Sequence, residues 1–321
     1  GAGGAADATA ETTLFSNGAP MTSSRLRART MNNPNLNAVA KTPLVAVLIP
    51  ARSLPGTTDP SQLALFQHLV PSMFGTLKCD HLRGVRLELY VGYDAGDAFY
   101  DDADNQAWIQ EKYTELWHTA LRYYPALTDM PKAPPLHLLR YVAMKGAPCW
   151  IWNMLSLRAY ADDATHFLQL NDDNQMLNEC WASNLISSLD LDDGFGVVGP
   201  RDMNNQRLLT QAMVSRTHID IFGKLYPDVF RNWYSDDWLS MVYGVSHTTM
   251  DDRVVVVNSQ TQGTRYKKNQ EAGEWLQDEV EKGKRVVAQF LDFESQAHRK
   301  ERGRPLRPWG DTKGGTQQYI K

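Results

Sequence analysis

The stretch LVAVLIPAR, residues 44–52, is a short and almost wholly apolar run that ends around a proline. A run of this length and character is typical of a β-strand buried on both faces, because a strand with one wet face alternates apolar and polar residues. Strands of that kind occur mainly in parallel sheets that helices cover on both sides. This run therefore favours an α/β architecture.

Segments with strand and helix patterns alternate along the chain after this run. The strand patterns cover 85–97, 136–142 and 165–171, and the helical patterns cover 63–74, 105–122 and 149–161. Helices between strands connect parallel neighbours by right-handed crossovers. We therefore expect one α/β domain of Rossmann-like kind, with a mainly parallel central sheet flanked by helices.

The two ends of the chain differ from its middle. Residues 1–43 are small, polar and aperiodic, which predicts a flexible leader or linker, and residues 296–321 form a basic tail rich in Gly and Pro. Residues 44–295 are expected to fold, since 42% of the chain is hydrophobic. The leader has the composition of a stem cut from a membrane anchor, which would place the protein in a secretory lumen (Golgi or ER). It equally has the composition of a flexible cytosolic extension, so the sequence leaves the cellular compartment open.

Composition argues against two classes of partner. The 33 basic and 37 acidic residues leave a net charge of −4, so no global basic field recruits nucleic acid. No segment approaches the roughly 18 apolar residues of a membrane span, and none is expected in this chain.

The chain has three cysteines. Cys79, Cys149 and Cys180 lack metal-ligand spacing, but they allow one disulfide.

Acidic residues follow the strand patterns. The stretch HFLQLNDDNQM, residues 166–176, is apolar until it reaches Asp172 and Asp173, and Asp94 follows the second strand. The carboxyl ends of parallel strands form the ligand-binding edge of such a sheet, so these acids and Arg52 should share one crevice. Neighbouring carboxylates there can hold a divalent cation. An Asn/Asp-rich turn is the plainer interpretation of the motif by itself.

The order of these motifs resembles that of the nucleotide-diphospho-sugar glycosyltransferases of the GT-A fold, especially the large family 2-like group. In that family a strand ends in an acidic loop, a Gly and an Asn follow, and an apolar strand then enters a DxD motif. The matching positions here are Asp94, Asp97, Gly146, Asn153 and residues 171–173. A strict DxD is absent, because Asn171 stands at its first position. The resemblance covers roughly residues 44–245.

The resemblance implies a metal-dependent glycosyltransferase that moves a sugar from a nucleotide-diphosphate donor, with a UDP-sugar as the first guess, to a hydroxyl of a glycan, glycoprotein or small-molecule acceptor. It places the nucleotide sugar in residues 44–176 and the acceptor and catalysis in 177–295. Asp173 and Asp172 would hold Mn²⁺ or Mg²⁺, and His247 is the candidate for a further ligand. The implied donor contacts are Pro50, Ala51, Arg52, Tyr93, Asp94, Asp97, Lys145, Asn153, Asp172 and Arg265.

A second acidic pair lies in NWYSDDWL, residues 232–239. The resemblance matches Asp236 and Asp237 to acids that open a helix in such enzymes, where many relatives carry Glu at the first position. Carboxylates against apolar walls have a raised pKa, which suits a general base. We expect Asp237 or Asp236 to be that base, with Asp237 preferred, and helix capping is the plainer alternative. The expected acceptor wall is Trp233, Tyr234 and Trp238.

Two other functions are compatible with this fold. A sugar-phosphate nucleotidyltransferase would carry a Gly-rich phosphate loop after the first strand, and PARSLPGTTDP at 50–60 lacks that Gly cluster. A catalytically silent carbohydrate-binding relative would have no need for two acidic pairs. Because one base without a protein nucleophile implies a single displacement, we expect transfer with inversion at the sugar.

Overall fold

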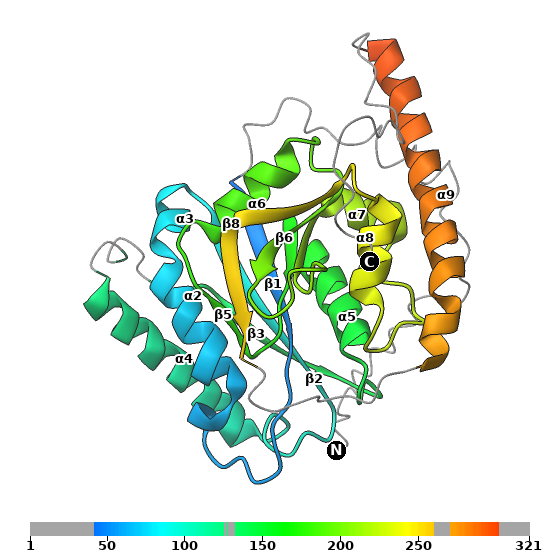
Figure 1. Cartoon of the computed structure of the whole chain (residues 1–321). Coiled ribbons are helices and arrows are strands. Elements are labelled where there is room, and N and C mark those ends of the chain that lie inside the picture. The colour runs from blue at the N-terminus through cyan, green and yellow to red at the C-terminus, as the bar shows by residue number, and fades with distance from the viewer. Residues whose placement is uncertain (1–41, 125–126, 128–131, 260–269, 302–321) are drawn as a thin grey trace, which may run out of the picture. The chain divides into compact units, whose positions relative to one another are not determined.

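The computed structural model describes residues 42–124, 127, 132–259 and 270–301. These residues fold around a central β-sheet (Figure 1). Its strands are β1 (Leu44–Pro50), β2 (Arg86–Asp94), β3 (Leu136–Tyr141), β4 (His166–Gln169), β5 (Asn174–Met176), β6 (Val197–Asp202), β7 (Ala212–Ser215) and β8 (Thr248–Asn258). They lie in the order β3-β2-β1-β4-β7-β6-β8-β5.

Most neighbouring strands of this sheet run parallel. β1 pairs in parallel with β2 and β4, and β2 with β3, whereas β7 runs antiparallel between β4 and β6. β8 is parallel to β6 and carries the short antiparallel strand β5 at the edge. The expectation of a mainly parallel α/β sheet is confirmed, and β7 is an antiparallel strand that the sequence did not predict.

The first strand is buried on both faces. All seven residues of β1 are buried, with Val45, Val47 and Ile49 in one apolar cluster and Leu44 and Leu48 in the other. Alternate side chains of a strand point to opposite faces, so a strand with a core on each side must be apolar throughout. The continuous apolar run of the sequence has this physical cause.

Helices cover both faces of the sheet. The described helices are η2 (Pro60–Gln62), η3 (Leu65–Leu69), α2 (Val70–Thr76), α3 (Lys78–Leu82), α4 (Ala103–Tyr123), α5 (Pro148–Ala161), α6 (Trp181–Asp190), α7 (Arg216–Phe222), α8 (Ser235–Tyr243) and α9 (Gln270–Glu301). In Figure 1, α2 and α4 lie on one side of the sheet and α5, α7, α8 and α9 on the other. None of the described helices is both long and apolar enough to cross a bilayer.

The domain boundaries expected after residues 43 and 295 stay predictions. The leader 1–43 lies outside the described residues except for 42 and 43, so its expected flexibility stays a prediction. α9 runs to Glu301, which is past residue 295, where the folded domain was expected to end. Most of the predicted basic tail also lies outside the described residues.

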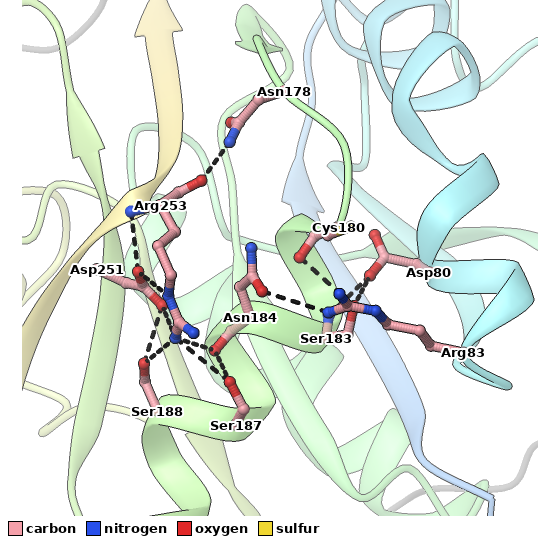
Figure 2. Close-up of polar contacts among 10 residues, drawn as sticks. All are labelled: Asp80, Arg83, Asn178, Cys180, Ser183, Asn184, Ser187, Ser188, Asp251 and Arg253. Carbon is pink, nitrogen blue, oxygen red and sulfur yellow. Dashed lines mark hydrogen bonds and ion pairs between the residues drawn. The ribbon is translucent and has the colours of Figure 1, made fainter.

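A disulfide joins α3 to the start of α6. Cys79 and Cys180 form this bond, and their Cα atoms are 4.9 Å apart. Next to it the fully buried Asp80 accepts hydrogen bonds from Ala182 N (3.2 Å) and Ser183 N (2.7 Å), which otherwise lack acceptors at a helix start. Figure 2 shows Asp80 beside Ser183. Burial raises the pKa of Asp80, although these hydrogen bonds oppose the shift. Of the pairings that the three cysteines allowed, the structure shows this one.

The other end of α6 is tied to β8. Arg253 donates from Nη2 to Asp251 Oδ2 (2.7 Å) and to Ser188 Oγ (2.8 Å), and Ser188 Oγ donates to Asp251 Oδ2 (2.8 Å) (Figure 2). Asp251 is 5% exposed, so its charge is compensated by a guanidinium rather than by water. The helix is therefore fixed at both ends by covalent or charged contacts.

We expect the Cys79–Cys180 bond to stabilise the domain, because it closes a loop with a sequence separation of 101 residues. Reduction should lower the free energy of unfolding by about 2–4 kcal/mol. The measurement is the melting temperature with and without reductant, for the wild type and for Cys79→Ser/Cys180→Ser. Reductant should lower only the wild-type value, and an equal response of both proteins would contradict the bond.

Candidate functional site

The carboxyl ends of β1, β2 and β4 meet at one edge of the sheet. Because these strands are parallel, Arg52 after β1, Asp94 at the end of β2 and Asp173 after β4 share this edge. β8 ends there too, since Ser259 N donates to Asp173 O at 3.0 Å. The convergence of strand ends expected from the sequence is thus present, and we call it the carboxyl edge.

The four polar residues that follow β4 form a turn closed by amides. Asn171 N donates to Asn174 Oδ1 (2.6 Å), and Asn174 N donates to Asn171 O (3.2 Å). The carboxylates of Asp172 and Asp173, which are 1% and 3% exposed, are therefore not needed to close the turn. Burial raises the pKa of Tyr100, and the nearby charges of Asp172 and Asp97 add to this shift.

Asp172 and Asp173 fit a cation of one particular kind. Among the described residues, no three His, Cys, Asp or Glu side chains gather into a group that could hold a metal ion. Two neighbouring carboxylates in one turn offer hard oxygen ligands only. Mg²⁺ and similar ions are commonly bound by one or two carboxylates, with water and substrate phosphates completing the shell. The two acids thus suit an ion that arrives with a phosphate.

His247 lies at the opposite end of the strands from the carboxyl edge. β4 is antiparallel to β7, β7 is antiparallel to β6, and β6 is parallel to β8, so β8 runs in the same direction as β4. His247 comes just before β8 and therefore lies where the strands begin, with Nδ1 3.3 Å from Asp192 Oδ2. A residue there cannot share an ion with Asp173 at the carboxyl edge. The prediction of His247 as a metal ligand is therefore wrong.

Asp97 joins two loops of the carboxyl edge. Its Oδ2 accepts from Ser53 N (2.7 Å), and its Oδ1 accepts from Ser53 Oγ (2.7 Å), Tyr100 N (3.0 Å) and Phe99 N (3.1 Å). The loop after β1, which carries Arg52, is held against the loop after β2 by this carboxylate. Asp97 thus acts within the protein, although the sequence suggested a contact to the donor.

Tyr93 is packed in the core. Its ring is 2% exposed and stacks on Tyr100 with 5.2 Å between ring centroids, and its hydroxyl accepts from Gln106 Nε2 at 2.9 Å. Burial raises the pKa of Tyr93. A ring held in this way offers little surface for stacking on a nucleotide base. Pro50 and Ala51 are also buried.

The loop after β3 lies along the end of β2. Met144 N donates to Asp94 Oδ1 at 2.6 Å, which holds this loop against the strand end. Lys145, the next residue, is exposed, and its carbonyl accepts from Arg231 Nη2 at 3.4 Å. Asp94 and Lys145 are therefore near each other at the carboxyl edge, where the sequence predicted donor contacts.

Asn153 connects α5 to the segment that precedes α8. Its Nδ2 donates to Tyr226 O (2.8 Å) and its Oδ1 accepts from Tyr226 N (2.7 Å), while the side chain is 6% exposed. Both polar atoms of the amide are used by the backbone of Tyr226. Asn153 therefore orders this segment, and the sequence had assigned it to the donor.

The second acidic pair occupies the first turn of α8. Asp236 and Asp237 are partly buried. The pKa of Asp236 is raised to about 6: burial is the main cause and the charge of Asp237 adds to it, while the backbone amides at the helix start and Arg207 oppose the shift. A carboxyl group with this pKa is ionised at neutral pH and is more basic than an ordinary aspartate.

The surroundings place Asp236 at the carboxyl edge. Arg207 belongs to the loop between the end of β6 and the start of β7, and Cys149 belongs to the first turn of α5 after the β3 loop. Both groups interact electrostatically with Asp236, and burial raises the pKa of the Cys149 thiol to about 12. The charge of Asp236 also contributes to the raised pKa of the buried Tyr226. Sequence reasoning missed Arg207 and Tyr226, since neither lies in a recognisable motif.

Of the three predicted acceptor aromatics, Trp233 is the most open. It is 40% exposed, whereas Trp238 is 2% exposed and donates from Nε1 to Glu279 O at 3.0 Å. Tyr234 is partly buried against α9 at Gly273. Trp238 is therefore a core residue, and Trp233 retains a surface for a ligand. Arg265, the last predicted donor contact, lies outside the described residues.

Comparison with known proteins gives likenesses of structure only. No family model and no curated protein matches the sequence. The fold is similar to a fragment of TarS from S. aureus, with 12% identity over 81% of this chain and 73% of that one and a TM-score of 0.45. The same fragment in complex with UDP-GlcNAc gives 11% identity over 81% and 74% of the two chains and a TM-score of 0.46.

A second similar structure is that of GalNAc-T7 with UDP, GalNAc and Mn²⁺. Here 10% of residues are identical over 68% of this chain, the TM-score is 0.45, and the chain spans 44% of the length of that protein. These likenesses concern the fold alone. The function has to be sought in the residues of this chain.

The raised pKa of Asp236 predicts a pH-dependent cost in stability. Since folding raises this pKa, the folded state binds the proton more tightly, so the residue's ionisation costs stability above about pH 6 and the cost fades as the pH falls toward 4. Asp236→Asn should therefore melt about 2–4 °C higher than the wild type near neutral pH, the shift that about 1 kcal/mol produces. The measurement is thermal melting of both proteins across this pH range.

The control is Asp252→Asn, because the Asp252 side chain is 78% exposed. This variant should follow the wild type at every pH. A difference between Asp236→Asn and the wild type that stays constant with pH would show that Asp236 has an ordinary pKa.

Proposed function

We propose that this protein is a glycosyltransferase that moves a sugar from a nucleotide-diphosphate donor to an acceptor hydroxyl, with Asp236 as the general base. The observation that carries this proposal is the partly buried acid pair of α8, whose Asp236 has a pKa raised to about 6 and lies at the edge where β4 ends in Asp172 and Asp173. One acidic pair suits a cation and its phosphates, and the other suits a base.

The two acidic pairs would act on opposite ends of the reaction. In a single displacement, Asp236 accepts the proton of the acceptor hydroxyl while the oxygen of that hydroxyl bonds to the anomeric carbon. The bond from that carbon to the diphosphate breaks, and the diphosphate leaves with the electron pair. When bound at Asp172 and Asp173, a divalent cation supplies charge neutralisation for this leaving group. Attack from the face opposite the diphosphate gives inversion.

The roles of the two acids at α8 are set by their surroundings. The sequence favoured Asp237 as the base, but burial raises the pKa of Asp236, which makes Asp236 the better proton acceptor near neutral pH. We assign Asp237, its neighbour in the same turn, to orienting the acceptor. Trp233, with 40% of its surface exposed, offers an apolar face on which a sugar ring can stack.

On the donor side, three side chains of the carboxyl edge remain as contacts. Asp94 Oδ1 holds Met144 N, and as a carboxylate Asp94 can accept further hydrogen bonds from a base or a ribose hydroxyl. Arg52 and the exposed Lys145 carry the positive charge that a diphosphate requires. A glycan, a glycoprotein or a small molecule could serve as the acceptor.

Nucleotide binding provides the test of the cation site. Titration calorimetry of UDP, GDP and CDP, each with and without Mn²⁺, should show one nucleotide that binds only with the metal. Asp173→Ala should weaken this binding by more than about tenfold, which corresponds to a loss of about 1.4 kcal/mol. Asp252→Ala, which removes an exposed carboxylate from β8, should bind like the wild type. Binding that is equal with and without Mn²⁺ would contradict the site.

Transfer itself provides the test of the base. Asp236→Asn should bind the nucleotide like the wild type, and its kcat should fall by about 10²–10⁴-fold, the contribution of a general base. The wild-type rate should fall as the pH drops below about 6, because the base becomes protonated. A wild type that binds donor but never transfers sugar would favour the silent relative, and an Asp236→Asn variant with normal kcat would exclude Asp236 as the base.

A further inference from the structure

The long helix α9 packs against α8 through its backbone (Figure 1). Trp238 of α8 donates from Nε1 to the carbonyl of Glu279, and its indole is 2% exposed. At Gly283 an added Cβ would lie 2.6 Å from Val242 Cγ2 and 3.3 Å from Trp238 Cζ2. The side chains of α8 therefore fit directly onto the main chain of α9, and a methyl group would not fit between them.

The closest approach near the acidic pair is at Gly273. A Cβ there would lie 2.6 Å from Tyr234 Oη and 2.9 Å from Tyr234 Cζ. These distances are shorter than real Cβ atoms tolerate, and an aromatic ring has no flexible end that could move aside alone. The Tyr234 ring is therefore seated against bare backbone of α9.

Tyr234 also has an unusual backbone conformation. It immediately precedes α8 and has φ 72°, in the left-handed region. That region costs a non-glycine residue about 1–2 kcal/mol, so surrounding contacts must maintain it. This residue sets the direction in which the chain enters the first turn of α8, which carries Asp236 and Asp237. The contact with Gly273 thus holds the residue from which the acidic turn starts.

Glycine inside a helix is itself unfavourable. Each one costs about 1 kcal/mol relative to alanine. Gly273 and Gly283 both lie within the helix span of α9, where the side chains of Tyr234 and Val242, respectively, approach the α9 backbone closely. The cost is offset where the missing side chain allows the close approach. At Gly283 the partner is mainly Val242, near the end of α8, while at Gly273 it is Tyr234, which immediately precedes α8.

We propose that Gly273 is a positioning residue for the base of the proposed transferase: it admits the Tyr234 ring and so fixes the turn that aims Asp236. The inference rests on the proposed function, and it adds α9, distant in sequence, to the machinery of the site. The groups that face Asp236, namely Asp237 on α8, Arg207 after β6, Cys149 on α5 and the buried Tyr226, would all be retained when Gly273 is changed.

The test is Gly273→Ala, with Gly283→Ala as the matched control in the same helix. Both changes replace a helical glycine of α9 by alanine, and both insert a methyl group 2.6 Å from a side chain, that of Tyr234 before α8 or that of Val242 in α8. Gly273→Ala should lower kcat by about tenfold or more, as expected when a reacting group is displaced, with KM for the donor and nucleotide binding unchanged. Gly283→Ala should keep kcat within about threefold whatever its melting temperature.

A second change tests the cause. In Gly273→Ala/Tyr234→Phe, the hydroxyl that would lie 2.6 Å from the new methyl is gone, while the ring carbon Cζ at 2.9 Å remains, so kcat should recover in part, by at least about threefold relative to Gly273→Ala alone. Equal losses of kcat in the two single variants would indicate general loosening of α9 and overturn the proposal. A folded Gly273→Ala with wild-type kcat, or a failure of the double variant to recover, would overturn it as well.

An activity-independent readout separates this proposal from the proposed function. The ¹³C carboxyl resonance of Asp236, assigned by its loss in Asp236→Asn, gives the titration midpoint directly. Gly273→Ala should move this midpoint from about 6 toward the ordinary aspartate range, because a displaced turn exposes the carboxyl to water, and Gly283→Ala should not. If the wild type transfers no sugar, the function fails while the midpoint still decides the positioning role, and an unmoved midpoint overturns it.

Discussion

The burial of β1 on both faces is the constraint on which the rest of the structure depends. A strand with a core on each side belongs to a sheet that helices cover on both faces, and β1 pairs in parallel with β2 and β4. Parallel pairing places the ends of these strands at one edge. The acids that follow β2 and β4 are neighbours for this reason, although about eighty residues separate Asp94 from Asp172 in the chain.

Two kinds of polar residue lie at that edge. Asp97 and Asn153 use their polar atoms on the protein backbone, so they fix the loop after β1 and the segment before α8. Asp172 and Asp173 sit in a turn that amides already close. Two neighbouring carboxylates offer the hard oxygen ligands that a divalent cation with phosphate ligands takes.

The sequence predicted elements better than it predicted side-chain roles. Apolar runs and helical periodicity located β1, β2, β3 and β4, because a core on both faces leaves a clear pattern. The sequence pattern gave no sign that β7 is antiparallel. The direction of β8, and with it the end of the strands at which His247 lies, depends on that strand order. Tyr93 and Trp238 have the same residue types as ligand-stacking aromatics, so burial in the core was visible only in the structure.

The account's central claim is that the carboxyl edge binds a nucleotide diphosphate through a divalent cation at Asp172 and Asp173. Crystals grown with Mn²⁺ and each candidate nucleoside diphosphate would test it through the anomalous scattering of manganese. The account predicts one manganese peak beside Asp173, with the diphosphate bound to the manganese on the side away from Asp173. A peak at the edge that carries His247, or a nucleotide bound at the carboxyl edge with no manganese beside it, would contradict the account.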